Sequence, residues 1–263
     1  MIFVKSFPAK FMITKNELKY YSSLLQKKYR ISEYKFIAEG RKLVEEAVRS
    51  DYKVEVIFCT SSFKENNNSF FQNKLLKDFR IEVIKDAEFE KLSDTKSPQG
   101  IAGVFYQEKE DKLKKFSGNL LVALENISDP GNLGTIIRNC DWFGIKEILL
   151  NKNSAEVFNP KVLRASMGSV FHLNIFEEEN FISTLQKAKE KEYEIITADL
   201  NGDNLYGFGK SEKTIIAFSN EANGPSEELL KITNRKITIP GKGKAESLNV
   251  ASASAVILSE LTK

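Results

Sequence analysis

The sequence predicts an α/β protein with two domains, of which the second is built on a mostly parallel sheet. Runs of β-favouring residues alternate with segments of helical periodicity along the chain, as in layered α/β proteins. The run 120–126 is almost continuously apolar, like a strand buried on both faces of a parallel sheet. The segment 107–119 is charged and lacks an apolar face. We therefore expect a first domain over 1–107, a linker over 108–118 and a second domain over 119–263.

The composition is that of a soluble globular protein, with 41% hydrophobic and 29% charged residues among 263. No apolar run approaches the roughly 18–20 residues of a membrane span, and the N-terminus has no signal-peptide core. We therefore expect a cytoplasmic protein without a membrane partner. Two cysteines and one histidine argue against a disulfide framework and against a zinc site, so we expect no metal.

The charge is unevenly distributed: residues 1–117 carry a net charge of +6 and the remainder −3. A basic first domain suits a phosphate-rich partner such as RNA, although solvated basic surfaces are common. Within it, a basic and aromatic cluster could contact RNA phosphates and bases, or could equally be a solvated helix end. The cluster consists of Lys27, Lys28, Arg30 and Lys35 around Tyr29 and Tyr34.

The first domain is expected to begin with a helix, because Leu18, Tyr21, Leu24 and Leu25 recur at helical spacing within 14–30. Further helices are predicted at 41–50, 70–79 and 86–93, and strands at 34–38, 54–59, 81–84 and 101–106. The polar stretch 61–69 is expected to be a loop.

In the second domain, Asp129-Pro130 is a strong helix start, since aspartate caps and proline fits the first helical position. Strands are predicted at 120–126, 146–151, 172–176, 194–200, 214–219 and 236–240. Helices are predicted at 130–143, 160–171, 181–193 and 225–232, and after Ser247, which we expect to be the N-cap of the last helix. In such a sheet, ligands bind beyond the carboxyl ends of the strands.

Three loops at those carboxyl ends contain the informative residues. After the first strand, Gly131, Gly134, Thr135 and Arg138 recur at helical spacing opposite the apolar side. This predicts a glycine-lined face that ends in a guanidinium and could approach RNA phosphate or ribose. The stretches 219–225 and 239–250 are the other two loops. Each of these stretches, taken alone, could equally be a solvated helix face or a surface turn without a ligand.

Together the three loops resemble the three motifs of the SpoU/TrmH branch of the SPOUT superfamily, the trefoil-knot RNA 2′-O-ribose methyltransferases. The matching residues are Asn132, Gly134, Arg138 and Phe143-Gly144; then Asn220, Glu221, Gly224 and Ser226; then Ile239, Pro240, Gly243 and Ser247-Leu248-Asn249-Val250. The resemblance covers about 118–263. The segments 34–48 and 92–104 resemble, more loosely, the ribosomal-protein-like substrate-binding domain that precedes the catalytic domain in many members.

The resemblance implies methyl transfer from S-adenosylmethionine to a ribose 2′-hydroxyl, within a knotted α/β domain. It implies that the donor is bound by Ser219, Asn220, Gly224, Ile239 and Leu248. It implies a catalytic set of Asn132, Arg138, Glu221, Ser247 and Asn249. Family proposals make the arginine the base, but a guanidinium is a poor base. We expect Arg138 instead to stabilise the developing alkoxide and to anchor phosphate.

Family members are homodimers through the knot region, with one subunit's arginine helping to complete the other's site, and we expect the same here. The two-domain layout favours ribosomal RNA, 23S in particular, over transfer RNA as the partner. Transfer RNA methylation remains an alternative. So does a non-catalytic RNA-binding protein that has lost donor binding, because the family usually has glycine where this chain has Ser219 and Ala222. A small-molecule methyltransferase would leave the basic first domain without a purpose.

The sequence also predicts where the aromatic side chains lie. Trp142 and most phenylalanines are expected in the core, with Phe63, Phe70 and Phe71 as candidates for base stacking. The run 241–244 lacks the spacing of a nucleotide-binding phosphate loop.

Overall fold

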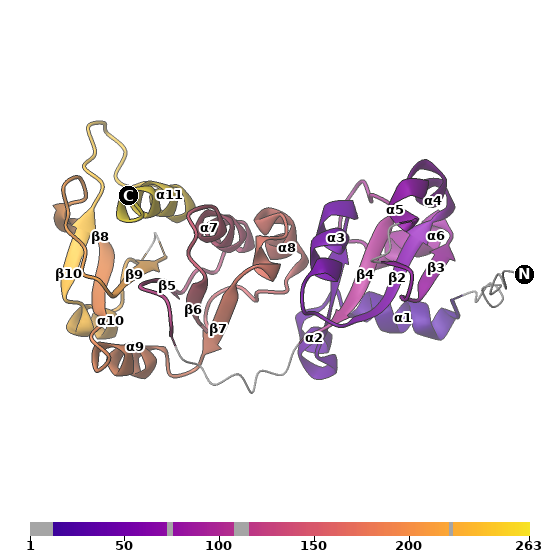
Figure 1. Ribbon diagram of the computed structural model, residues 1–263, viewed down its shortest axis with the longest axis horizontal. Coiled ribbons are helices and arrows are strands. Elements are labelled where there is room, and N and C mark those ends of the chain that lie inside the picture. The colour runs from indigo at the N-terminus through magenta and orange to yellow at the C-terminus, as the bar shows by residue number, and fades with distance from the viewer. Residues whose placement is uncertain (1–12, 73–75, 108–115, 221–222) are drawn as a thin grey trace, which may run out of the picture. The chain divides into compact units, whose positions relative to one another are not determined.

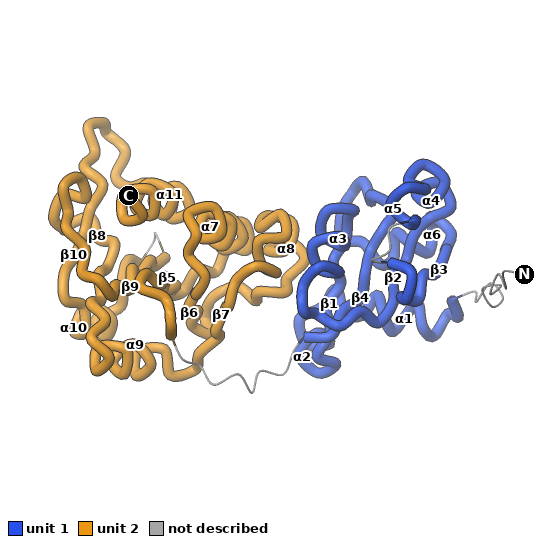
Figure 2. The backbone as a smooth tube through the Cα atoms, in the orientation of Figure 1, with its two compact units in different colours: residues 1–109 blue, residues 110–263 orange. Residues whose placement is uncertain are grey.

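The computed structural model describes residues 13–72, 76–107, 116–220 and 223–263. The chain forms two compact units, residues 1–109 and 110–263 (Figure 2). Most of the expected linker, 108–118, lies outside the described residues. None of the helices in the described ranges is both long enough and apolar enough to cross a membrane.

Unit 1 is a four-stranded mixed sheet in the order β1-β4-β2-β3, where β4 is antiparallel to β1 and β2, and β3 is parallel to β2. Its strands are β1 (Lys35–Glu39), β2 (Val54–Thr60), β3 (Ile81–Ile84) and β4 (Ile101–Tyr106). Its helices are α1 (Lys15–Ser23), α2 (Lys27–Glu33), α3 (Arg41–Arg49), α4 (Ser61–Asn66), α5 (Asn68–Phe71) and α6 (Asp86–Phe89), with a 3₁₀ turn at Glu90–Leu92. One hydrophobic cluster packs α1 against this sheet through Leu18 and Tyr21.

The expected helix over 14–30 is broken into α1 and α2 by a buried arginine. Arg30 is 2% exposed, and its Nη1 donates to the carbonyl oxygens of Leu24 (2.9 Å) and Leu25 (2.7 Å). Carbonyls at a helix end have no intrahelical donor, so this guanidinium satisfies the end of α1. Arg30 is therefore structural, and it is not available to RNA as part of the basic cluster.

The stretch 61–69, which we expected to be a loop, forms the short helices α4 and α5. The reason is Thr60, whose side chain caps α4 by accepting a hydrogen bond from the backbone N–H of Phe63 at 3.2 Å. Part of the expected helix 70–79 lies outside the described residues.

Unit 2 is a six-stranded sheet, all parallel, in the order β10-β8-β9-β5-β6-β7. This confirms the predicted fold class. Its strands are β5 (Leu120–Glu125), β6 (Glu147–Asn151), β7 (Asn174–Glu178), β8 (Glu194–Asn204), β9 (Thr214–Ser219) and β10 (Arg235–Thr238). Its helices are α7 (Pro130–Trp142), α8 (Pro160–Ser166), α9 (Phe181–Lys189), α10 (Glu227–Ile232) and α11 (Val250–Leu261), with a 3₁₀ turn at Ser169–Phe171.

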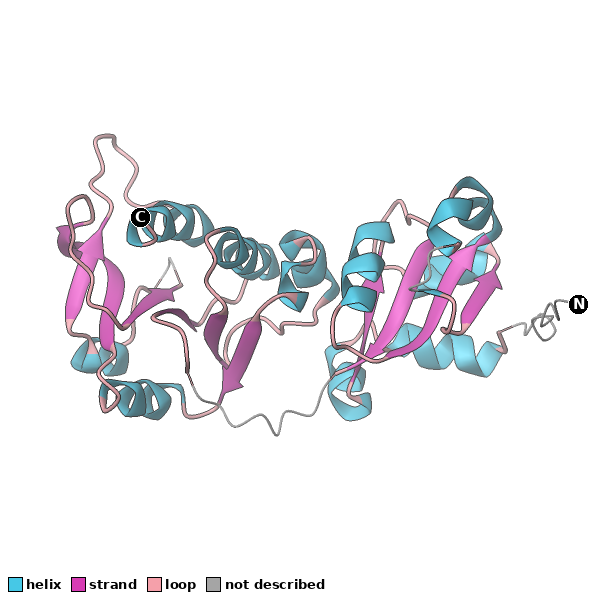
Figure 3. Cartoon of the chain, viewed as in Figure 1, coloured by secondary structure: helices cyan, strands magenta, loops and turns pink. Residues whose placement is uncertain are grey.

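The helices cover both faces of this sheet, with α7, α8 and α11 on one side and α9 and α10 on the other (Figures 1 and 3). Alternate residues of β5 point to opposite faces, so Leu121 and Ala123 pack into the cluster that contains Leu185 of α9 and Leu229 of α10. The expected helix 160–171 ends earlier, at Ser166. Met167 and Gly168 there take the left-handed backbone conformation that ends helices.

Candidate functional site

The site lies at the carboxyl ends of β5 and β9, the two central strands of unit 2. From β5 the chain builds the sheet outward through β6 and β7, and it then crosses to the other side, where β8, β9 and β10 follow. The strand order reverses between β5 and β9, which is where parallel α/β sheets bind ligands. The last residues of the two strands, Glu125 and Ser219, are paired neighbours.

The first and third motifs meet through two asparagine side chains. Asn249 Nδ2 donates to Asn132 Oδ1 at 3.0 Å, across 117 residues of sequence. Asn249 Oδ1 accepts from the backbone N–H groups of Ala251 (3.0 Å) and Ser252 (3.3 Å). Asn249 is therefore the N-cap of α11, and the expected cap at Ser247 is wrong. The amide of Asn249 caps the helix with its oxygen and binds Asn132 with its nitrogen. Ser247 lies three residues before the first residue of α11, so it does not occupy the N-cap position.

Helix α7 is fixed on two sides, and one of its glycines is used for packing. Asn139 Nδ2 donates to Ala251 O (3.0 Å) and Ser254 Oγ (2.9 Å) of α11. Gly134 is buried against α8, where a Cβ would lie 2.5 Å from the Cβ of Ala165. The expected glycine-lined ligand face is therefore wrong at Gly134, because close helix packing needs the missing side chain there.

The start of α7 is capped by Asp129, whose Oδ1 accepts the backbone N–H of Asn132 at 2.9 Å. This hydrogen bond, with the nearby ammonium of Lys161, holds the pKa of Asp129 below its ordinary value. The cap fixes the backbone at Asn132, so it helps to orient the side chain that meets Asn249.

The second motif is held by a buried carboxylate. Glu125 is 4% exposed, and it accepts hydrogen bonds from the hydroxyls of Ser219 (3.0 Å) and Ser226 (2.6 Å). The Ser219 side chain, which replaces the usual glycine, is therefore turned inward to Glu125. Sequence reasoning missed Glu125, although a carboxylate at the end of an apolar strand was a signal for it.

A second polar network lies beside this carboxylate. Asn126, with a left-handed backbone (φ 58°), exchanges hydrogen bonds with Asn151 of β6, and its carbonyl oxygen accepts from Asn220 Nδ2 at 3.4 Å. These contacts hold the first residue of the second motif against the end of β5. Strained polar residues of this kind are frequent at ligand sites.

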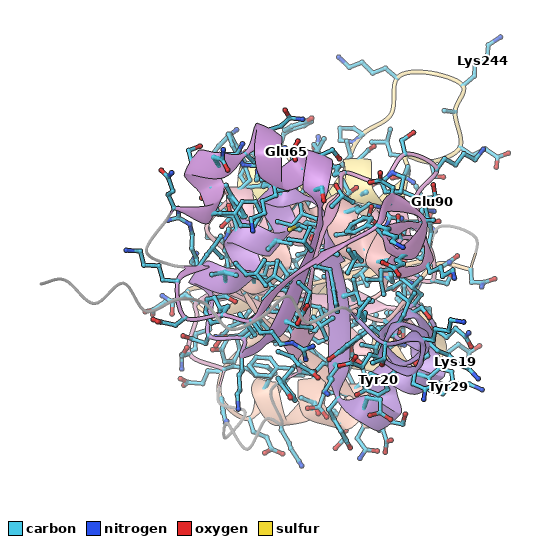
Figure 4. All side chains as sticks on the ribbon, turned by 90° about the vertical axis from the view of Figure 1, so that its right-hand side faces the viewer. Lys19, Tyr20, Tyr29, Glu65, Glu90 and Lys244 are labelled. Atoms are coloured by element: carbon cyan, nitrogen blue, oxygen red, sulfur yellow. The ribbon has the colours of Figure 1, made fainter. Side chains whose placement is uncertain are left out.

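The other expected site residues take no part in the hydrogen bonds described above, and their positions are as follows. Arg138 is exposed on α7, on the same helical stripe as Thr135 and Trp142. Ile239 directly follows β10, and Ser247 and Leu248 lie on the exposed loop 240–249, where Leu248 is 49% exposed. Figure 4 shows this loop projecting, with Lys244 at its tip pointing outward. Gly224 has a positive φ of 64°. Glu221 and Ala222 lie outside the described residues.

Trp142 contradicts the expectation that it belongs to the core. Its side chain is 83% exposed at the last turn of α7. Cys140, two residues earlier, is fully buried, and burial raises the pKa of its thiol. His172, the single histidine of the sequence, is 2.7 Å from Asp141 Oδ2 through Nδ1.

In unit 1, several of the aromatic and basic side chains proposed to contact RNA bind other residues of the same unit. Lys35 pairs with Glu55 at 2.7 Å and donates to the hydroxyl of Tyr20 at 3.0 Å, so it too is withdrawn from the basic cluster. Lys27 and Lys28 are exposed, and Lys28 lies over the ring of Tyr29. Figure 4 shows Tyr29 close to Tyr20 and Lys19 on one face.

The three phenylalanines that were candidates for base stacking pack on one another. Phe63, Phe70 and Phe71 meet edge to face at 5.3–6.3 Å between ring centroids, and Phe70 is buried. Phe70 is therefore part of the core of unit 1. Within the described ranges, no three His, Cys, Asp or Glu side chains gather as a metal site requires.

Comparison with known proteins gives consistent matches to both units. Residues 119–259 match the model of the SpoU rRNA methylase family, and residues 15–103 match the MRM3-like substrate binding domain. The chain is 31% identical over 246 residues to the 23S rRNA (guanosine(2553)-2′-O)-methyltransferase RlmP of Bacillus subtilis, covering 93% of this chain and 95% of that one.

Solved structures of methyltransferases also match this chain over nearly its whole length. A TrmH-family protein from Porphyromonas gingivalis superposes with a TM-score of 0.84 at 32% identity, covering 95% of this chain and 98% of that one. The AdoMet-bound rRNA methyltransferase from Sinorhizobium meliloti superposes with a TM-score of 0.81 at 27% identity, covering 94% of each chain.

Proposed function

This chain belongs to the SpoU rRNA methylase family, and on that premise we propose that it methylates a ribose 2′-hydroxyl of ribosomal RNA. The single observation that supports this most is the contact between Asn132 and Asn249 at 3.0 Å. It joins the first and third motifs near the carboxyl end of β5, beside which the second motif begins at Ser219, and this is the point of strand-order reversal where parallel α/β sheets bind ligands.

The residues present fit S-adenosylmethionine as the donor. The Ser219 hydroxyl is bonded to Glu125, so this side chain leaves the backbone of the second motif open to a ligand. Leu248 and the loop around it are exposed and offer an apolar side chain and accessible backbone to an adenosine. Ser219, Asn220, Gly224, Ile239 and Leu248 would hold the donor, which supplies a methyl group already activated on a sulfonium.

The remaining task of the protein is to align the ribose oxygen with that methyl and to assist loss of one proton. The hydrogen bond between Asn132 and Asn249 orients both side chains, and these side chains are proposed to contact the ribose. Arg138, an exposed cation on α7, is suited to anchor phosphate and to stabilise negative charge on the oxygen. Glu221 and Ser247 complete the proposed set.

We further propose that a second copy of the chain covers the exposed side of α7. Trp142 is 83% exposed there, and large exposed aromatics commonly mark interfaces. Arg138 shares this stripe, so a partner that covers Trp142 would come close to Arg138. Sedimentation equilibrium should give the dimer mass, and Trp142→Glu should give the monomer mass; a monomer in the unsubstituted protein contradicts this proposal.

The substrate is proposed to be 23S ribosomal RNA, because the B. subtilis relative acts on 23S rRNA and matches both units. The test is transfer of labelled methyl from S-adenosylmethionine into unmodified 23S rRNA transcripts and, separately, unmodified transfer RNA. Label in 23S rRNA, recovered as an alkali-resistant 2′-O-methyl dinucleotide, is the expected result. Label only in transfer RNA would overturn the substrate, and label in neither would favour a donor-less RNA-binding protein.

A further inference from the structure

We infer that Glu125 is a positioning residue that ties both ends of the second-motif loop, Ser219 and Ser226, and so prepares it for the methyl donor. This rests on the proposed function, since the loop is proposed to bind S-adenosylmethionine.

The two oxygens of the Glu125 carboxylate hold both Ser219 and Ser226, and we call this arrangement the clamp. Glu125 Oε2 accepts from Ser219 Oγ and from the backbone N–H of Ser226, both at 3.0 Å. Glu125 Oε1 accepts from Ser226 Oγ at 2.6 Å. Ser219 ends β9 and Ser226 precedes α10, so one side chain joins the end of this strand to the start of this helix.

Packing alone does not explain a charge at this position. Glu125 is 4% exposed, and a buried carboxylate is costly unless hydrogen bonds compensate for its lost hydration. Three donors on two oxygens provide that compensation, and hydrogen bonds to a charged acceptor are strong. A carboxylate can accept from all three donors at once, whereas an amide of the same shape has one accepting oxygen.

The clamp also fixes the element that follows the loop. Ser226 Oγ accepts from the backbone N–H of Leu229 at 3.1 Å, as the N-cap of α10. The hydroxyl that donates to Glu125 therefore also starts the helix. The carboxylate and the two serines therefore fix both the end of β9 and the start of α10.

The consequence concerns donor affinity. Gly224 N donates to Asn220 O at 2.9 Å, so these two residues of the second motif are also held in place. Residues that are held in place before binding lose less conformational freedom when the ligand arrives. Glu125 should therefore act mainly on binding of the donor and little on the methyl-transfer step.

The test compares two buried glutamates of the same sheet. Glu147 is 3% exposed and accepts from Ser117 N, Ser117 Oγ and Gly118 N, but it lies at the amino end of β6, away from the site. Glu125→Ala should weaken binding of S-adenosylmethionine, measured by calorimetry, at least tenfold. It should raise the KM for the donor similarly and leave kcat at saturating donor within about threefold. Glu147→Ala should leave donor affinity unchanged.

Hydrogen exchange without donor tests the clamp independently of binding. The amides of Ser219, Asn220, Gly224 and Ser226 should exchange at least tenfold faster in Glu125→Ala than in the unsubstituted protein, and their exchange should be unchanged in Glu147→Ala. Glu125→Gln, which retains one accepting oxygen, should fall between. If Glu125→Ala does not fold, Glu125→Gln and Ser219→Ala take its place, each with an expected loss of affinity of about fivefold.

Unchanged affinity and unchanged loop exchange in the Glu125 variants would overturn the inference, as would an equal loss in Glu147→Ala. If the unsubstituted protein bound no donor, the proposed function would fail instead, and the exchange comparison would still decide whether Glu125 holds the loop.

Discussion

The packing of α7 on α8 makes Gly134→Ala a sharp test of how the first motif is positioned. A Cβ at Gly134 would lie 2.5 Å from Ala165 Cβ, 2.7 Å from Val162 O and 3.0 Å from Ser166 N, all on α8. Carbon atoms pack best at about 3.5–4.0 Å, so the two helices would have to separate by about 1 Å. The carbonyl and the amide are backbone atoms and cannot rotate away.

The expected net loss in the free energy of unfolding is about 2 kcal/mol. Overpacking costs about 1–3 kcal/mol, and rigid backbone places this case near the upper end. Alanine in place of glycine inside a helix returns about 1 kcal/mol. Gly131→Ala is the control in the same helix: its Cβ would meet only side-chain atoms, Asp129 Oδ1 at 2.9 Å and Lys161 Cε at 3.7 Å, so a cost of about 1 kcal/mol for disturbing the Asp129 cap is offset by about 1 kcal/mol of helix propensity. We expect it to change stability by less than about 1 kcal/mol.

The assay is native-state hydrogen exchange, read at the slowest amides of β5, since these report global opening of unit 2 by itself. A loss of about 2 kcal/mol corresponds to roughly 30-fold faster exchange. Exchange in Gly134→Ala that is unchanged or slower than in the unsubstituted protein would refute the close packing inferred here.

Three further predictions concern other parts of the chain. Arg138→Lys should keep donor affinity and lose most methyl transfer, because it loses the planar fork that anchors phosphate; full turnover would contradict this. Arg30→Met should destabilise unit 1 by about 2–3 kcal/mol, because the carbonyls of Leu24 and Leu25 lose their buried donor; unchanged exchange in β4 would contradict it. Burial raises the pKa of Cys59 to about 11 and raises that of Cys140, so both thiols should react with a disulfide reagent at pH 8 far more slowly than in urea. The neutral thiol is favoured in the folded state, so this contribution to stability is present below about pH 8.5 and falls as the pH rises towards 11.

The sequence by itself determined the fold class and indicated where the candidate site lies. Hydrophobic periodicity identifies parallel strands and the helices between them, because burial imposes a repeat of 2 or 3.6 residues. Asp129-Pro130 began α7 as expected, because capping depends on residues adjacent in sequence. The three motifs could be aligned with the carboxyl ends of β5, β9 and β10, and the family match followed from them.

Only the tertiary structure decided how individual side chains are used, since the partners of these residues are distant in sequence. Gly134 looked like part of a ligand face, but α8, about 30 residues later, occupies the space beside it. Serine and asparagine are both good N-cap residues, so the sequence did not distinguish Ser247 from Asn249. In the structure Asn249 caps α11, and its side chain also contacts Asn132. Trp142 is apolar and was expected in the core, yet it falls on the exposed stripe of α7. Glu125 became visible as a clamp only when β9 was placed beside β5, because a hydrogen-bond partner 94 or 101 residues away leaves no local pattern.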